Sequence, residues 1–543
     1  PMAYWVNEKM FAIVEQSKRL GDIGTARMGL ATGNNGRFVR AWQECRMSNV
    51  GLGVRNRKDA EMRKLKWFPY AKGGSYRKWY GNNEFLVDWS SDGHDIRTTL
   101  HPSGERIWAH NFNLEHIFRS SITWSLITSG DLSVRYNPDG FLFDGTGTCA
   151  FFESPEIQLT VLGLLNTNFV RDFSKILNPT LAFQAGDFEN IPFRSEIEND
   201  IFVKNVSRLI ELARTDWDTY EVSWDFTSNP LIRQSKSCLN SAFASWEASA
   251  LAAVEEMQRL EVMNNCSVNA AYGLAVGKST EVPEGEITLA RSDREKDCQR
   301  LISYAIGCMM GRYSLDEPGL IYAHAGNVGF EPGRYATFPA DADGIVPVTD
   351  ELWFADDACS RIREFLRAVW GPDTLEENMA WLAESLGTKA TETPDETIRR
   401  YLADKFFKDH LQTYKKRPIY WLFSSGKQGA FQCLVYLHRY HEGTLSRMRA
   451  EYVVPLTAKI AARIDLMNND AEAASSAAAR TKINKQIEVL RKKQTELLAF
   501  DEKLRHYADM RIKLDLDDGV KANYGKFGDL LDSVKAITGG SEE

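Results

Sequence analysis

Hydrophobic and polar positions follow two different patterns, and the change occurs near residue 193. Before it, short apolar or alternating runs bounded by Gly, Pro, Asn and Asp predict strands. After it, apolar residues recur at the spacing of an amphipathic helix. The strands are expected over 84–89, 122–127, 132–135 and 141–144. The helices are expected over 196–214, 241–263, 297–310, 360–369, 397–411 and 429–442.

Three local signals complete the pattern of the first part. Asn137-Pro138-Asp139-Gly140 predicts a tight turn between two strands. Ser154-Pro155 predicts the start of a helix through 157–165, because Ser caps a helix and Pro fits its first turn. Residues 1–20 are expected to be helical and 178–193 extended.

A long helical hairpin is expected over 444–513. One stretch carries apolar residues at 3/4 spacing, with Gln494 interrupting it and Lys and Glu on the other faces. These apolar residues are Ile483, Ile487, Leu490, Leu497 and Leu504. The predicted fold class is therefore α+β, in three parts: a mixed, β-rich domain over 1–193, a helical domain over 194–443, and the hairpin with its tail over 444–543.

Composition and length fit a globular protein of several domains. The 543 residues are 43% hydrophobic and 26% charged, which excludes wholesale disorder. No apolar run reaches the roughly 18 residues of a membrane span, and the N-terminus has no signal-peptide pattern. A chain that begins at Pro1 is expected to be a piece of a longer protein. Eight cysteines without a C-x-x-C pair suit a reducing cytoplasm, and no metal is expected.

Positive charge is concentrated near the start, although the net charge is −8. Residues 27–78 hold thirteen Lys and Arg against three Asp and Glu. Such a segment attracts polyanions by releasing their counterions. The alternative is a solvated surface without a ligand. The thirteen are Arg27, Arg37, Arg40, Arg46, Arg55, Arg57, Lys58, Arg63, Lys64, Lys66, Lys72, Arg77 and Lys78.

Glycines, amides and aromatic residues lie between these cations. Thr32-Gly33-Asn34-Asn35-Gly36-Arg37 is a turn signal, and Lys72-Gly73-Gly74 and Arg77-Lys78-Trp79-Tyr80-Gly81-Asn82-Asn83 repeat the mixture. Glycine lets a backbone approach a phosphate, whereas Arg and Asn read guanine and adenine edges. The density of Gly and Pro predicts loops on a β scaffold, where recognition residues usually lie.

Motifs for chemistry are largely absent. Ser424-Ser425-Gly426-Lys427-Gln428 lacks the first Gly and the Ser/Thr of a P-loop. Phe143-Asp144-Gly145-Thr146-Gly147 resembles an S-adenosylmethionine turn, but Cys149-Ala150-Phe151-Phe152 after it looks like strand rather than helix, which favours a hairpin or bulge. No N/D-P-P-Y/F motif for gripping a flipped adenine occurs. The pattern indicates recognition and assembly rather than catalysis.

The residues nonetheless resemble a known family, PglX, the adenine-specific DNA methyltransferases of BREX phage-defence systems. The similarity extends over nearly the whole chain. The strings that carry it are Ala3-Tyr4-Trp5-Val6, Gly29-Leu30-Ala31-Thr32-Gly33-Asn34-Asn35, Lys66-Trp67-Phe68-Pro69-Tyr70, Lys72-Gly73-Gly74, Arg77-Lys78-Trp79-Tyr80-Gly81-Asn82, Ile122-Thr123-Trp124-Ser125, Asn178-Pro179-Thr180-Leu181, Gly311-Arg312-Tyr313-Ser314-Leu315, Arg417-Pro418-Ile419-Tyr420-Trp421-Leu422-Phe423 and Leu514-Asp515-Leu516-Asp517-Asp518-Gly519-Val520.

The resemblance implies the recognition portion of an enzyme that methylates adenine N6 and so marks host DNA. The catalytic motifs and S-adenosylmethionine would lie outside this chain, which is then inactive alone. The implied partners are double-stranded DNA, the N-terminal methyltransferase domain and other BREX proteins, with no membrane. The concentrated positive charge gives a further hypothesis, a phage protein that mimics DNA as a partner. Two rival hypotheses remain: an assembly scaffold that does not read DNA, and the specificity part of a restriction-modification fusion.

Specific residues are expected to contact DNA from the 1–193 region. Cations would bind phosphates or bases and Asn side chains would read bases; the alternatives are a solvated or ion-paired surface and turn chemistry. The side chains of Trp67, Trp79 and Tyr80 are expected to lie in the hydrophobic core rather than to stack on bases. Lys415-Lys416-Arg417 is expected to contact the DNA backbone at the edge of a groove. The hairpin 444–513 is expected to be either an intramolecular strut or an arm that docks other BREX proteins. The predicted DNA-binding residues are Arg27, Asn34, Asn35, Arg37, Arg40, Lys72, Arg77, Lys78, Asn82 and Asn83.

Overall fold

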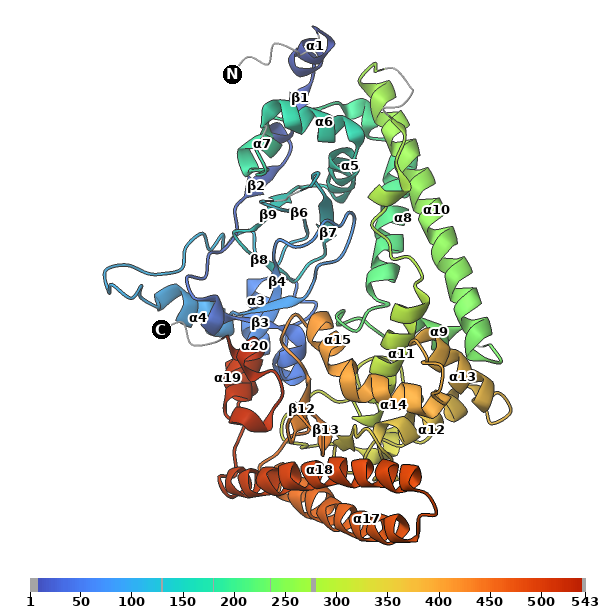
Figure 1. Ribbon diagram of the computed structural model, residues 1–543. Coiled ribbons are helices and arrows are strands. Elements are labelled where there is room, and N and C mark those ends of the chain that lie inside the picture. The colour runs from blue at the N-terminus through green and yellow to red at the C-terminus, as the bar shows by residue number, and fades with distance from the viewer. Residues whose placement is uncertain (1–7, 128–129, 179, 235, 275–279, 540–543) are drawn as a thin grey trace. The chain divides into compact units, whose positions relative to one another are not determined.

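The computed structural model describes residues 8–127, 130–178, 180–234, 236–274 and 280–539 (Figure 1). The chain forms two compact units, each described by itself. Unit 1 comprises residues up to Trp42, Ser48–Ser223 and Glu247–Ser292. Unit 2 comprises Gln43–Met47, Trp224–Trp246 and Asp293–Glu543. The string 3–6, Pro179 and the first seven residues of the predicted helix 1–20 lie outside the described residues.

Two four-stranded sheets form the centre of unit 1, as the turn-rich pattern before residue 193 predicts. The first sheet is antiparallel and has the order β2 (Thr25–Arg27), β9 (Gly147–Phe151), β6 (Ser121–Ser125) and β7 (Val134–Asn137). The second has the order β3 (Val39–Ala41), β5 (Phe85–Asp88), β4 (Trp67–Ala71) and β8 (Leu142–Phe143), with only the β4–β8 pair parallel.

Helices cover the apolar face of the first sheet. Helix α5 (Pro155–Leu165) begins as predicted, because the Ser154 hydroxyl accepts the N–H groups of Glu156 and Ile157. Helices α8 (Asp200–Trp217) and α10 (Leu239–Ala271) also contribute to this core, which includes Ile122, Trp124, Val206, Leu209 and Met257. The compact units therefore do not follow the predicted boundary at 193, because the amphipathic α8 and much of α10 bury their apolar faces in unit 1.

The remaining elements of unit 1 correct two local predictions. Helix α3 (Arg57–Arg63) lies inside the segment predicted as loops, because 57–63 contains no Gly or Pro and the Asn56 side chain caps it. Helix α7 (Ala185–Glu189) interrupts the predicted extended stretch 178–193. The others are α1 (Glu8–Gln16), β1 (Lys18–Arg19) paired with β10 (Pro192–Phe193), α2 (Asn35–Phe38), α4 (Ser90–Thr98) and α6 (Asn168–Leu177).

A three-stranded antiparallel sheet lies within unit 2, in the order β11 (Ile345–Pro347), β13 (Gln432–Tyr436) and β12 (Tyr420–Ser424). Strand β13 shows that the predicted helix over 429–442 is wrong. Cys433, Leu434, Val435 and Tyr436 are all buried in the central strand. A strand covered on both faces is apolar throughout, so its sequence is not distinguishable from a buried helix by periodicity.

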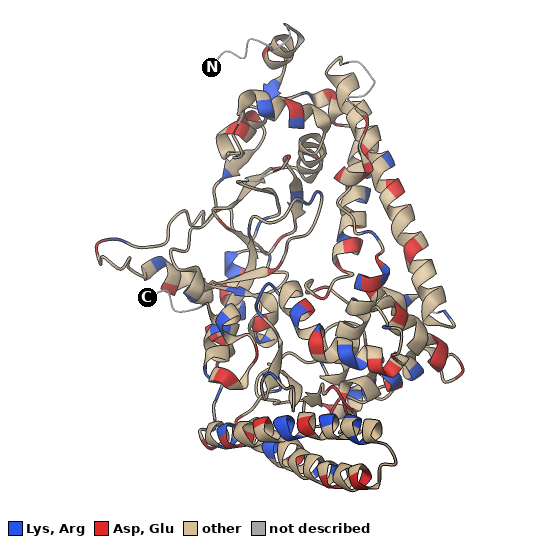
Figure 2. Cartoon of the chain, in the orientation of Figure 1, with Lys and Arg blue, Asp and Glu red and all other residues tan. Residues whose placement is uncertain are grey.

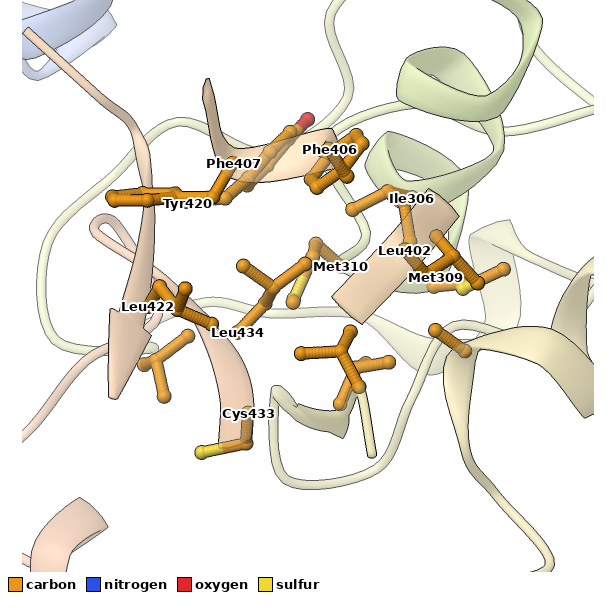
Figure 3. Packing of buried hydrophobic residues seen from close by; sticks show 14 of the residues in the cluster. Ile306, Met309, Met310, Leu402, Phe406, Phe407, Tyr420, Leu422, Cys433 and Leu434 are labelled. Carbon is orange, nitrogen blue, oxygen red and sulfur yellow. The ribbon is translucent and has the colours of Figure 1, made fainter. Parts of the chain in front are cut away.

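Helices surround this sheet and close a second core. Figure 3 shows Ile306 and Met309 of α11, and Met310 directly after it, packed near residues from α14, α15, β12 and β13. Met309, Met310 and Leu434 are fully buried. The helices are α9 (Pro230–Arg233), α11 (Arg294–Met309), α12 (Ala358–Trp370), α13 (Leu375–Ser385), α14 (Pro394–Asp404), α15 (Phe406–Thr413), α16 (Thr444–Arg447), α19 (Gly519–Gly525) and α20 (Val534–Thr538).

The predicted long helical hairpin is confirmed as α17 (Val454–Ala473) and α18 (Ala477–Asp509). Ile487, Leu490, Leu497 and Leu504 are buried, whereas both signs of charge line the exposed surface (Figure 2). Lys493 is an exception, since its buried amino group lies 2.6 Å from Asp350. The fold class is thus mixed α+β with a helical C-terminal region, as predicted. No described helix combines the length and hydropathy needed to cross a bilayer.

One carboxyl group in unit 2 makes stability depend on pH. Burial and the neighbouring Asp341 raise the pKa of Asp343 to about 7. The folded state then binds more protons than the unfolded state between about pH 4 and pH 7, so stability falls as pH rises through this window. Asp343→Asn is expected to remove this loss and to stabilise the protein at pH 8 by about 1–2 kcal/mol. Urea unfolding at pH 5 and pH 8 measures it.

The matched control is Asp470→Asn, at an exposed carboxylate of α17. This substitution should leave the difference in unfolding free energy between pH 5 and pH 8 unchanged. An Asp343→Asn protein whose stability falls with pH as steeply as the unmodified chain would contradict the assignment of this loss to Asp343.

Candidate nucleic-acid interface

Lys78 is buried in unit 1 rather than displayed on its surface. Its side chain is 6% exposed and its Nζ lies 2.7 Å from Oε2 of Glu261, a carboxylate that also accepts the Trp79 indole N–H at 2.7 Å. Burial lowers the pKa of Lys78, but the charge and hydrogen bond of Glu261 together with the neighbouring Tyr76 and Glu286 outweigh it and leave the pKa raised. Lys78 therefore has the structural role that was left open as the alternative, and it is removed from the candidate DNA contacts.

Arg77 is also bound to partners inside unit 1. Its Nη2 lies 2.8 Å from Asp216, its Nε donates to the carbonyl of Tyr80 at 2.7 Å, and its guanidinium lies over the Trp217 ring. A guanidinium with these partners, 11% exposed, holds the segment 77–81 against α8. Arg77 is set aside as a primary DNA contact for the same reason: an internal ion pair already satisfies its charge.

Lys72 and Arg40 are also engaged inside unit 1. The Lys72 amino group lies 2.8 Å from Asp144, and Arg40 is buried, with Nη1 donating to the carbonyls of Gly36 and Val39. Burial would raise the pKa of Asp144, but hydrogen bonds from Lys72 and Thr146 lower it. Both cations are set aside as primary DNA contacts.

The turn at 143–147 does not fit S-adenosylmethionine. The Asp144 carboxylate accepts the Thr146 N–H at 2.7 Å and binds the Thr146 hydroxyl and Lys72, so its oxygens are used within the turn. Gly147 lies so close to the Ala71 carbonyl that an added Cβ would be 2.6 Å from that oxygen. A strand, β9, follows the turn directly, as the sequence predicts, but the turn connects β8 of the second sheet to β9 of the first and does not close a hairpin.

Most of the candidate asparagines make hydrogen bonds within their own turns. Asn34 caps α2 by accepting the Arg37 N–H at 3.0 Å, and Asn35 accepts the Thr32 hydroxyl at 2.7 Å. Asn82 has φ +61° and donates to the Ser75 carbonyl, while Asn83 is buried. Asn34 and Asn35 remain at the surface of a turn, whereas Asn82 and Asn83 belong to the packed loop. Trp67, Trp79 and Tyr80 are buried, as favoured.

Two predicted cations stay exposed, Arg27 and Arg37, and they bracket one segment of unit 1. That segment lies against a second one that the sequence prediction passed over. Ala31 and His110 exchange backbone hydrogen bonds at 3.1 Å, and Asn113 donates to the carbonyl of Met28 at 2.9 Å. Residues 27–37 and 94–119 thus form one surface, here named the recognition face.

The turn 32–37 is attached directly to this second segment. Arg37 lies 3.5 Å from Asp95 and 3.4 Å from the Thr99 hydroxyl. Gly33 has φ +73°, and a Cβ there would meet the Trp108 ring at 2.4 Å. Only glycine therefore lets the turn approach Trp108, which explains one residue of the Thr32–Arg37 signal.

The recognition face is rich in basic and titratable groups. It contains five arginines, four of the nine histidines and three acidic residues. The acidic side chains are Asp95, Glu105 and Glu115. Figure 2 shows Lys and Arg among the elements of this region, and also on most helices of both units. A sequence signal for the missed segment exists: His101-Pro102-Ser103-Gly104 predicts an exposed turn.

Two further basic sites named from the sequence lie in unit 2. Arg46 is exposed there, and Arg417 binds the buried Glu44 at 2.5 Å, which occupies one cation of the Lys415-Lys416-Arg417 cluster. Among the described residues, no group of three or more His, Cys, Asp or Glu is arranged to hold a metal ion.

Comparison with known proteins relates the chain to two curated methyltransferases. It is 42% identical to the adenine-specific methyltransferase BrxX of Escherichia coli O9:H4 (strain HS), over all of this chain and 46% of the relative. It is 37% identical to the adenine-specific methyltransferase PglX of Lacticaseibacillus casei (strain Zhang), over 97% of this chain and 44% of that relative. The chain is homologous to part of these methyltransferases. It spans just under half of their length, and no family model matches it.

Proposed function

We propose that this chain is the DNA-recognition portion of an adenine-specific DNA methyltransferase of BREX phage defence, and that the recognition face binds the duplex. The observation that carries the proposal is the joining of 27–37 to 94–119, which places Arg27, Arg37 and Arg106 at exposed positions on linked segments. S-adenosylmethionine and the methyl transfer belong to a region outside this chain. Its other partners are that methyltransferase region and other BREX proteins.

Physical chemistry supports DNA over an acidic protein surface as the ligand. Arginines bind phosphates bidentately, and Asn34 and Asn35 stand at a turn beside them. The thirteen cations of 27–78 do not all bind DNA together, because Lys72, Arg77 and Lys78 form ion pairs with carboxylates of the same unit. Affinity therefore comes from a smaller set of arginines than the charge count suggests, and the predicted salt dependence is moderate.

Arg37→Ala tests the proposal in the whole chain. We expect weaker binding to all duplexes alike, and a slope of log K against log salt that is less steep by about one, because one phosphate contact is lost. Fluorescence anisotropy with a labelled duplex at several salt concentrations measures both. Lys204→Ala, an exposed cation on α8, is the matched control and should change neither.

Two results would contradict the proposal. One is an unmodified chain whose affinity for duplex DNA does not change with salt, which would favour the assembly scaffold. The other is an Arg37→Ala protein that binds with the original affinity and slope, as Lys204→Ala should.

A further inference from the structure

We propose that residues 99–108 form a two-stranded arm that enters the major groove of DNA and contacts thymine methyl groups through Leu100 and Ile107. This inference rests on the proposed function and names a reading element for it. The arm lies between α4 and β6, where the chain extends as a long loop from the sheets of unit 1 (Figure 1). None of its residues was among the predicted contacts.

Backbone hydrogen bonds make the arm an ordered ribbon. The His101 N–H donates to the Arg106 carbonyl at 2.8 Å, and the Trp108 N–H donates to the Thr99 carbonyl at 3.0 Å. Gly104, with φ +77°, donates to the His101 carbonyl at 2.7 Å and closes the tip. The base is held by the contact of Trp108 with Gly33 and by the pairing of His110 with Ala31.

The two apolar side chains lie opposite each other on the ribbon. Leu100 and Ile107 form an antiparallel bridge, and directly opposed residues in such a pair share one face. They are 55% and 45% exposed, so the ribbon presents a small apolar pair to the solvent. Neighbouring residues point to the other face, which places His101 and Arg106 together there.

The size and chemistry of this ribbon fit a major groove. That groove is about 12 Å wide and admits a two-stranded ribbon, whereas the minor groove of about 6 Å is too narrow. Apolar side chains in the major groove recognise the thymine methyl group. Arg106, on the opposite face, is placed to reach a phosphate at the groove edge. Arg37 and Arg27 lie on the segment that anchors the arm and bind the adjoining backbone.

The test uses the whole chain and a duplex selected by it from a random pool. Replacing thymine by deoxyuridine removes only the methyl group, and should weaken binding about fourfold for each contacted base. The double variant Leu100→Ser/Ile107→Ser should bind both duplexes equally. Met62→Ser, at a side chain that is 74% exposed on α3, is the control and should keep the difference.

Arg106→Ala provides a second readout. It should weaken binding to all sequences alike and reduce the salt slope by about one, whereas Glu105→Ala should not weaken binding. Thermal unfolding of each variant checks that unit 1 stays folded.

The outcomes separate the two proposals. If the unmodified chain shows no salt-dependent binding to DNA, the proposed function fails and the arm fails with it. If Arg37→Ala weakens binding but the serine double variant still distinguishes thymine from deoxyuridine, only the arm is overturned. Displacement of the chain by a minor-groove ligand would likewise overturn the groove assignment.

Discussion

Lys78→Met is expected to destabilise the protein by about 3–5 kcal/mol, because it leaves the carboxylate of Glu261 buried without its cation. Glu261 is 3% exposed, and its other oxygen accepts the neutral indole N–H of Trp79 at 2.7 Å. Urea unfolding monitored by tryptophan fluorescence measures the loss. The exposed Lys58→Met, on α3, is the matched control and should change stability by less than about 0.5 kcal/mol.

The double variant Lys78→Met/Glu261→Leu distinguishes a buried pair from a simple packing role. Replacing both charges by apolar groups removes the unpaired carboxylate, so the double variant should be more stable than Lys78→Met by about 2 kcal/mol. Equal stability of the single and double variants would show that the charge of Lys78 is not what holds this site together.

Gly29→Ala is expected to detach segment 27–37 of the recognition face from the second sheet. A Cβ at residue 29 would lie 2.2 Å from the Phe143 carbonyl oxygen and 2.6 Å from that of Asp144, and neither backbone group is able to rotate away. The same strand edge is held by the Leu30 N–H donating to the Phe143 carbonyl at 2.8 Å. The clash should cost about 2–3 kcal/mol and weaken DNA binding more than tenfold.

Gly36→Ala is the control on the same segment. A Cβ there meets only the Asn34 side chain at 3.4 Å, and residue 36 lies within α2, where alanine is favoured over glycine. We expect equal or slightly higher stability, measured by urea unfolding. A Gly29→Ala protein as stable as Gly36→Ala would contradict the close approach of residue 29 to β8.

The sequence predicted elements whose signals are local. Ser154 as a helix cap, the turn 137–140 and the hairpin of α17 and α18 depend on neighbouring residues alone, and each lies where it was expected. Strand β13 was mistaken for a helix because side chains from distant parts of unit 2 bury both of its faces, and one of its two partner strands, β11, is also distant in sequence. Periodicity does not contain that information.

The candidate site shows the same division. Arg27 and Arg37 were predicted as DNA contacts and are exposed. Arg77 pairs instead with Asp216, and Lys78 with Glu261, each more than 130 residues away in the sequence. A local excess of positive charge does not reveal such partners. The arm 99–108 was missed for the opposite reason: its charges nearly balance, and its relation to 32–37 depends on the contact of Trp108 with Gly33.

Hydrogen–deuterium exchange of the whole chain with and without duplex DNA tests the recognition face most directly. The account predicts that slowed exchange concentrates in 27–37 and 94–119, and that the slowing diminishes as salt is raised. Slowed exchange confined to α17 and α18, or the same exchange throughout in the presence of DNA at low salt, would contradict it.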